Sequence, residues 1–307
     1  MKGIVSLLTI PLIAFLTLGM TTAPFLLPSI TVESAFAQIE VSIQGDDRNN
    51  TLSNNTVIYS YNIYNNNNAQ EASTRLHNSS AIYYDNTTGY LVYPQPGNNT
   101  HQQELLPAVI MIHEWWGLNE HIKDQADLLA KEGYAVLAVD LYRGEVATDF
   151  DRAMELTSSV RNNSASAIDN LQSAVNYVKS LEIVDGSKVA SLGWCFGGDW
   201  SLQLALNSSE NPLAATIVYY GRPVTDTDSL SSITWPILGI FGDQDQAIPV
   251  ESVKQFASAL NTSGITNEIY LYEGVGHAFA NPSGDNYAPK ETDDAWQKTM
   301  GFLRMHL

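Results

Sequence analysis

The chain has 307 residues, of which 44% are hydrophobic, and this is enough apolar material to build one large domain. Its 15 basic and 33 acidic residues give a formal net charge of -18, which argues against a nucleic-acid partner because phosphate is bound by clustered lysine and arginine. The single cysteine excludes an intramolecular disulfide.

The N-terminus resembles an export signal. Lys2 precedes an apolar run over residues 4–18, and Ala35-Phe36-Ala37 supplies the small residues that a signal peptidase reads. We therefore predict a signal peptide over residues 1–37 and a secreted or extracytoplasmic protein. The alternative is an uncleaved leader that anchors the chain to a membrane, although prolines interrupt the apolar stretch. We expect membrane association only through such a leader.

Residues 38–78 are polar and rich in asparagine, including four in a row at 65–68. Such a composition cannot bury enough apolar surface to fold, so we predict a disordered linker. Asn-x-Ser/Thr sequons recur along the chain, but in so asparagine-rich a sequence they do not establish glycosylation.

Residues 79–307 alternate between strand-like and helix-like segments, which predicts an α/β domain. We expect a mostly parallel, doubly wound sheet with helices on both faces, whose reactive groups gather at the carboxyl ends of the strands. The strands are expected at 90–93, 107–113, 134–141, 188–192, 214–220, 236–241 and 268–272, and the helices at 120–132, 149–160, 164–181, 200–206, 251–260 and 293–306.

Cys195 lies in a Gly-x-Cys-x-Gly turn, Gly193-Trp194-Cys195-Phe196-Gly197, between a predicted strand and a predicted helix. This is the context of a nucleophile elbow, in which small neighbours let a tight turn expose one side chain. The alternative is a buried structural cysteine, the commoner fate of a free thiol.

A cysteine nucleophile needs a base, and His277 follows the last predicted strand on a glycine-rich loop. Its alternative role is that of a solvated loop histidine. Asp243 and Asp245 follow the preceding strand, and we favour Asp245 to orient the imidazole and Asp243 to cap the turn. The order nucleophile, acid, histidine is that of α/β-hydrolases.

The loop after an early strand reads His113-Glu114-Trp115-Trp116-Gly117. In α/β-hydrolases this loop donates one backbone N–H to the oxyanion hole, and the residue after the nucleophile donates the other. We therefore predict that Trp115 and Phe196 form that hole. Glu114 either lies beside the thiol and influences its ionisation, or caps the loop.

From about residue 80 onward the chain resembles the dienelactone hydrolase (carboxymethylenebutenolidase) family of α/β-hydrolases. The resemblance rests on residues 113–119, 139–142, 193–198, 245–249 and 276–279. It implies a Cys195-His277-Asp245 triad, and it implies that Glu114 pairs with the resting thiol and gives way when substrate binds.

The chain departs from the family prototype where that protein binds its substrate's carboxylate. Asn281 stands in place of an arginine, and Phe150 and Met154 replace an arginine and a tyrosine. Arg143, Arg152 and Arg222 are candidates to compensate, although each is equally typical of a surface charge. We predict substrate contacts from Asn281, Arg143 and Arg152.

Together these patterns predict a hydrolase that cleaves a lactone or ester bond of a small molecule through Cys195, as a monomer or small homo-oligomer. No cofactor or metal is expected, because the chain shows neither histidine or cysteine pairs with ligand spacing nor a nucleotide fingerprint. The alternatives are a general esterase or thioesterase for a larger acyl group, and a catalytically silent surface binding module.

Overall fold

The computed structural model describes residues 7–9, 29–31, 38–43, 57–62, 75–95 and 104–307, and the chain divides into two units, residues 1–73 and 74–307. In the first unit four strands form one sheet in chain order: β1 (Leu7–Thr9), β2 (Ser29–Thr31), β3 (Gln38–Ile43) and β4 (Val57–Asn62). The first two strands fall in the predicted leader and the other two in the predicted linker. The rest of both segments, apart from the start of the second unit, lies outside the described residues, so leader cleavage and linker disorder stay predictions.

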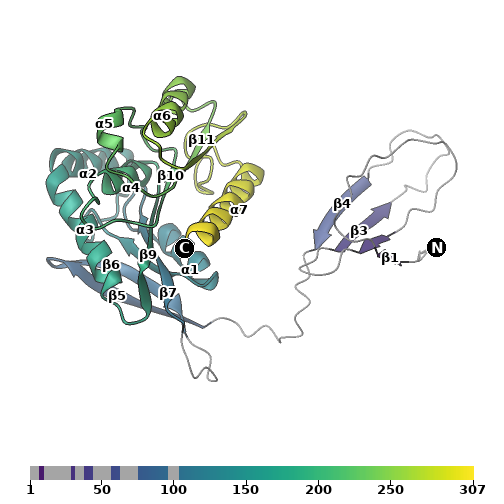
Figure 1. Ribbon diagram of the computed structural model, residues 1–307, viewed down its shortest axis with the longest axis horizontal. Coiled ribbons are helices and arrows are strands. Elements are labelled where there is room, and N and C mark those ends of the chain that lie inside the picture. Colours follow the sequence, from purple (N-terminus) through teal and green to yellow (C-terminus); the bar gives the residue numbers. More distant parts are fainter. Residues whose placement is uncertain (1–6, 10–28, 32–37, 44–56, 63–74, 96–103) are drawn as a thin grey trace. The chain divides into compact units, whose positions relative to one another are not determined.

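The second unit is built around an eight-stranded sheet with the order β12-β11-β10-β9-β7-β8-β6-β5 (Figure 1). The strands from β12 to β8 in this order are parallel, whereas at one edge β6 pairs antiparallel with β8, and β5 pairs antiparallel with β6. The strands are β5 (Leu76–Tyr84), β6 (Thr87–Pro94), β7 (Leu106–Ile112), β8 (Ala135–Val139), β9 (Val184–Trp194), β10 (Ala215–Tyr219), β11 (Ile237–Gly242) and β12 (Asn267–Tyr272).

Helices cover both faces of this sheet, and the central strands are apolar on both sides for that reason. In β7, Ala108, Ile110 and Ile112 join the core on one face, and Val109 and Met111 join the core on the other. The first face carries α2 (Phe150–Asn162), α3 (Ser164–Lys179), α4 (Phe196–Leu206), α5 (Thr227–Leu230) and α6 (Val250–Thr262), and the second carries α1 (Glu120–Lys131) and α7 (Pro289–His306).

The predicted mostly parallel sheet with helices on both faces is confirmed. Two elements of the second unit were not predicted: the short helix α5 and the edge strand β5, which begins inside the predicted linker. Within the part of the chain that the structure describes, no helix combines the length and the apolar character that a bilayer crossing requires.

Candidate active site

Cys195 lies in the tight turn between β9 and α4, as the sequence predicts. Its backbone has φ 54° and ψ -117°, a conformation that residues other than glycine rarely adopt. The turn is packed against neighbouring main chain, because a Cβ atom at Gly197 would lie 2.2 Å from the carbonyl oxygen of Ile112 and one at Gly198 would lie 2.6 Å from that of Tyr219. Glycine at these positions lets the turn close, and the thiol is left partly exposed.

The structure brings Cys195, His277 and Asp245 into one chain of contacts. The Cys195 Sγ atom lies 3.0 Å from Nε2 of His277, and Nδ1 of His277 lies 2.7 Å from Oδ2 of Asp245. The Asp245 carboxylate is buried, and its other oxygen accepts the N–H groups of Ala247 and Ile248 at 2.8 and 2.9 Å. These bonds fix the carboxylate, which in turn fixes the orientation of the imidazole.

Asp243, two residues earlier, has the role that the sequence favours for it. Its carboxylate accepts the N–H of Gly274 at 2.7 Å and thereby joins the loop after β11 to the loop that carries His277. It therefore caps a turn, and the neighbouring Asp245 is the carboxylate that reaches the imidazole.

Burial lowers the pKa of His277, but the hydrogen bonds and negative charges of Asp245 and Cys195 outweigh it and raise the pKa to about 10. The ring is therefore protonated at neutral pH. A protonated imidazole 3.0 Å from the sulfur stabilises the thiolate, which is the reactive form of cysteine.

His113 anchors the loop that carries Glu114 and Trp115. Its buried ring donates from Nδ1 to the Glu114 carbonyl at 2.5 Å and accepts at Nε2 the N–H of Leu141, after β8, at 3.2 Å. This pairing requires the neutral ring, in agreement with a pKa lowered by burial. Neither the N–H of Trp115 nor that of Phe196 donates a hydrogen bond to another described residue, so both predicted oxyanion donors are available.

Glu114 pairs differently from what the resemblance implies. Its buried carboxylate accepts the side-chain amide of Asn281, while the thiol pairs with His277. The neutral amide takes this carboxylate because Asn281, four residues after His277, points inward and is itself buried. The side-chain amide of Asn281, which the sequence predicts to contact substrate, therefore donates its hydrogen bond to Glu114. Burial raises the pKa of Glu114 to about 7.

We expect Glu114→Gln to raise the free energy of unfolding at about pH 8 by on the order of 3 kcal/mol. Because the pKa of Glu114 is raised on folding, its contribution to stability is complete below about pH 4.5 and is lost as the pH rises through about 7. Glutamine mimics the neutral acid, and its carbonyl still accepts the Asn281 amide. Denaturant titrations of the parent and the variant at about pH 8 and pH 4.5 measure the difference in the free energy of unfolding.

The gain from Glu114→Gln should disappear near pH 4.5, where the parent carboxyl is already neutral. The control is Glu210→Gln at an exposed carboxyl, which should leave the pH dependence of the parent almost unchanged. An equal gain at both pH values would contradict the assigned ionisation of Glu114.

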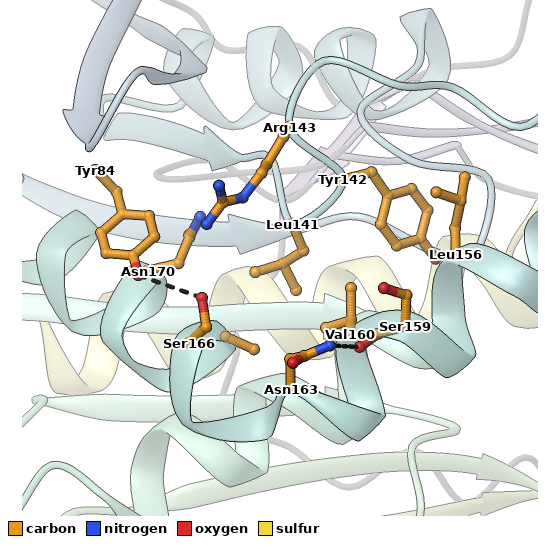
Figure 2. A pocket seen from close by; sticks show the side chains of 11 residues that line it. Tyr84, Leu141, Tyr142, Arg143, Leu156, Ser159, Val160, Asn163, Ser166 and Asn170 are labelled. Carbon is orange, nitrogen blue, oxygen red and sulfur yellow. Dashed lines mark hydrogen bonds between the residues drawn. The ribbon is translucent and has the colours of Figure 1, made fainter.

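The two arginines predicted to contact substrate are paired with surface carboxylates. Arg152 holds Glu145 with two nitrogens and Glu155 with a third at 2.6 Å. Arg143 lies 3.8 Å from Asp85 and lines a pocket of about 290 Å³, where Figure 2 shows it beside Tyr84. Sequence patterns could not reveal Glu145 and Asp85 as partners, because these pairs depend on how the chain brings loops together, whereas Glu155 lies three residues after Arg152 on α2.

Sequence reasoning did not single out Tyr220, which directly follows β10. Its ring makes an edge contact with His277 at 5.2 Å between centroids, and its backbone has φ 35°. Its hydroxyl is buried and has no hydrogen-bond partner among the described residues. The position directly after a central parallel strand is the signal that could have located it.

The arrangement is suited to acyl transfer. It combines a thiol held by a protonated imidazole, a carboxylate that fixes the imidazole, and two backbone donors at the edge of the turn. In the described ranges no group of three or more histidine, cysteine, aspartate or glutamate residues is placed to hold a metal ion.

Known proteins are similar to this chain in sequence and in fold. Residues 96–307 match the dienelactone hydrolase family. The chain is 30% identical over 224 residues to protein usf of Aquifex pyrophilus (71% of this chain, 93% of that one), and 32% identical over 231 residues to a Saccharolobus solfataricus protein named carboxymethylenebutenolidase (64% and 88%). The crystal structure of the dienelactone hydrolase-like promiscuous phosphotriesterase P91, from metagenomic libraries, shares the fold with a TM-score of 0.67 at 22% identity (75% and 98%). The chain belongs to the dienelactone hydrolase family, and it is a hydrolase that acts on ester bonds.

Proposed function

We propose that the protein hydrolyses a small ester or lactone through Cys195 as nucleophile, with His277 as acid and base and Asp245 as the group that orients it. The observation that carries this proposal is the unbroken line of contacts from sulfur to imidazole to buried carboxylate, at 3.0 and 2.7 Å. The family supplies the reaction class, since several relatives of this chain are named carboxymethylenebutenolidase.

In the first half of the reaction the Cys195 thiolate attacks the carbonyl carbon, and the N–H groups of Trp115 and Phe196 hold the resulting oxyanion. When the oxyanion collapses, the carbon–oxygen bond to the leaving group breaks. The leaving alkoxide takes the proton from Nε2 of His277, and a thioester remains on the sulfur.

In the second half His277, now neutral, removes a proton from water while the water oxygen attacks the thioester carbon. The carbon–sulfur bond breaks, the acid product leaves, and the thiolate and protonated imidazole are restored. Asp245 keeps Nδ1 protonated throughout, so that Nε2 exchanges the proton. Glu114 supports the charged ring, because its ionised carboxyl and protonated His277 attract one another.

We also propose that the protein is exported and acts as a monomer or small homo-oligomer outside the cytoplasm. The apolar run after Lys2 and the Ala35-Phe36-Ala37 sequence support export. The mass of the mature N-terminus tests this point separately, because cleavage after Ala37 leaves Gln38 as the first residue.

The catalytic proposal predicts an acyl group on Cys195 during turnover. We expect acid quenching of a reaction with a nitrophenyl ester to trap a species heavier than the protein by one acyl group, and peptide mapping to place that group on Cys195. An acyl group on another residue would contradict the assignment of the nucleophile.

A further inference from the structure

A cavity of about 350 Å³ lies beside the turn that carries Cys195. It is bounded by Arg161 near the end of α2, by Asp199 and Trp200 on α4, and by Arg222 on the loop after β10. The Cζ atom of Arg161 lies 5.7 Å from the ring centroid of Phe196, the residue after Cys195, so this arginine connects the cavity to the reactive turn.

Two guanidinium groups meet a single carboxylate in this cavity. Arg161 reaches Oδ2 of Asp199 with one nitrogen at 3.1 Å, and Arg222 reaches the same oxygen with two nitrogens, each at 2.9 Å. One carboxylate cannot neutralise two arginines, so this spot is positive on a chain whose formal net charge is -18. Two of the three guanidinium nitrogens of Arg161 have no hydrogen-bond partner among the described residues.

Trp200 provides an independent observation. Its side chain lines the cavity and is only 4% exposed, and its indole N–H has no acceptor in the described part of the chain. Buried indole N–H groups normally find an acceptor. The spare N–H groups of Arg161 call for a partner that is rich in acceptor oxygens and negatively charged, and the buried Trp200 forms part of the wall beside them.

We propose that this cavity binds a small oxyanion, a carboxylate or a phosphate, through Arg161 and Arg222. None of these residues occupies the positions at which the family prototype binds its substrate's carboxylate. The anion is either an acidic group of a molecule bound at Cys195 or a free oxyanion beside it. Binding does not require that Cys195 be the nucleophile.

The first experiment titrates inorganic phosphate and succinate into the full chain by calorimetry at fixed ionic strength. We expect Arg161→Gln combined with Arg222→Gln to weaken binding by at least about tenfold. The matched control is Arg304→Gln on α7, where an exposed arginine pairs with Glu132 at 2.7 Å, and it should bind like the parent. Equal affinity in all three proteins, or no binding of either anion to the parent, would overturn the proposal.

The second experiment distinguishes the two sources of the anion. It compares a neutral nitrophenyl ester with the nitrophenyl half-ester of a dicarboxylic acid. If the anion belongs to the substrate, the variant that combines Arg161→Gln with Arg222→Gln raises the ratio of KM for the acidic ester to KM for the neutral ester about tenfold. If it is a free oxyanion, the ratio of the two KM values stays that of the parent while phosphate binding is lost. Because Cys195→Ala keeps the cavity, retained phosphate binding in that variant separates this proposal from the catalytic one.

Discussion

Replacing Cys195 with alanine is expected to lower kcat/KM for ester hydrolysis by about four orders of magnitude or more. Alanine removes the only atom able to form the thioester, and the remaining backbone donors and imidazole cannot replace a covalent intermediate. Initial rates with a nitrophenyl ester measure the loss. Hydrolysis by the alanine variant at the rate of the parent would show that another group is the nucleophile.

Cys195→Ser is the matched control for the shape of the turn. Serine has nearly the volume of cysteine and should tolerate the same backbone conformation, so the melting temperature should remain close to that of the parent. Its activity should still fall sharply, because a hydroxyl does not form the anion that holds His277 in its protonated state. A stable and inactive serine variant thus assigns the loss to the sulfur and not to a collapsed turn.

Asp245→Asn is expected to lower kcat/KM by about three to four orders of magnitude. The asparagine amide would donate to Nδ1 of His277 and leave the proton on Nε2, where the reaction needs a base. Loss of the negative charge also lowers the pKa of His277, so the positive charge beside the sulfur is weakened. The alkylation rate of Cys195 by iodoacetamide across pH measures this second effect.

The control for this change is Asp243→Asn, two residues away. Asp243 caps the loop through the N–H of Gly274, so the variant should keep kcat/KM within about threefold of the parent and leave the pH profile of alkylation in place. If both variants had the same profile, Asp245 would act through the stability of the loop and not through the imidazole.

The arrangement of the triad was predictable because it depends on topology. In a parallel sheet, the loops that follow the carboxyl ends of the strands lie at one edge, and this placed Cys195 after β9, Asp245 after β11 and His277 after β12 near one another. The edge strand β5 was not predictable in the same way, since four polar residues, 77–80, follow Leu76 in its sequence LHNSSAIYY and buried residues occur only in its second half.

The hydrogen-bond partners of individual side chains in the site could not be predicted from the sequence. Glu114 and Asn281 are 167 residues apart, and their contact depends on the rotamers of two buried side chains. The pairing of Arg152 with Glu145 could not be predicted either. Helical spacing suggests only Glu155, which lies three residues after Arg152 on the same helix. The signal at Tyr220 was available but weak, as its neighbours are also aromatic or small.

The contacts that fix the reactive turn are made by main chain. Gly197 and Gly198 lie against carbonyl oxygens of β7 and β10, and no side chain takes part in either contact. Mutation of the surrounding side chains can therefore alter which molecules fit without displacing the sulfur. Such a division favours evolutionary change of specificity. It also makes the side chains around the turn, and not the turn, the place to begin engineering new substrates.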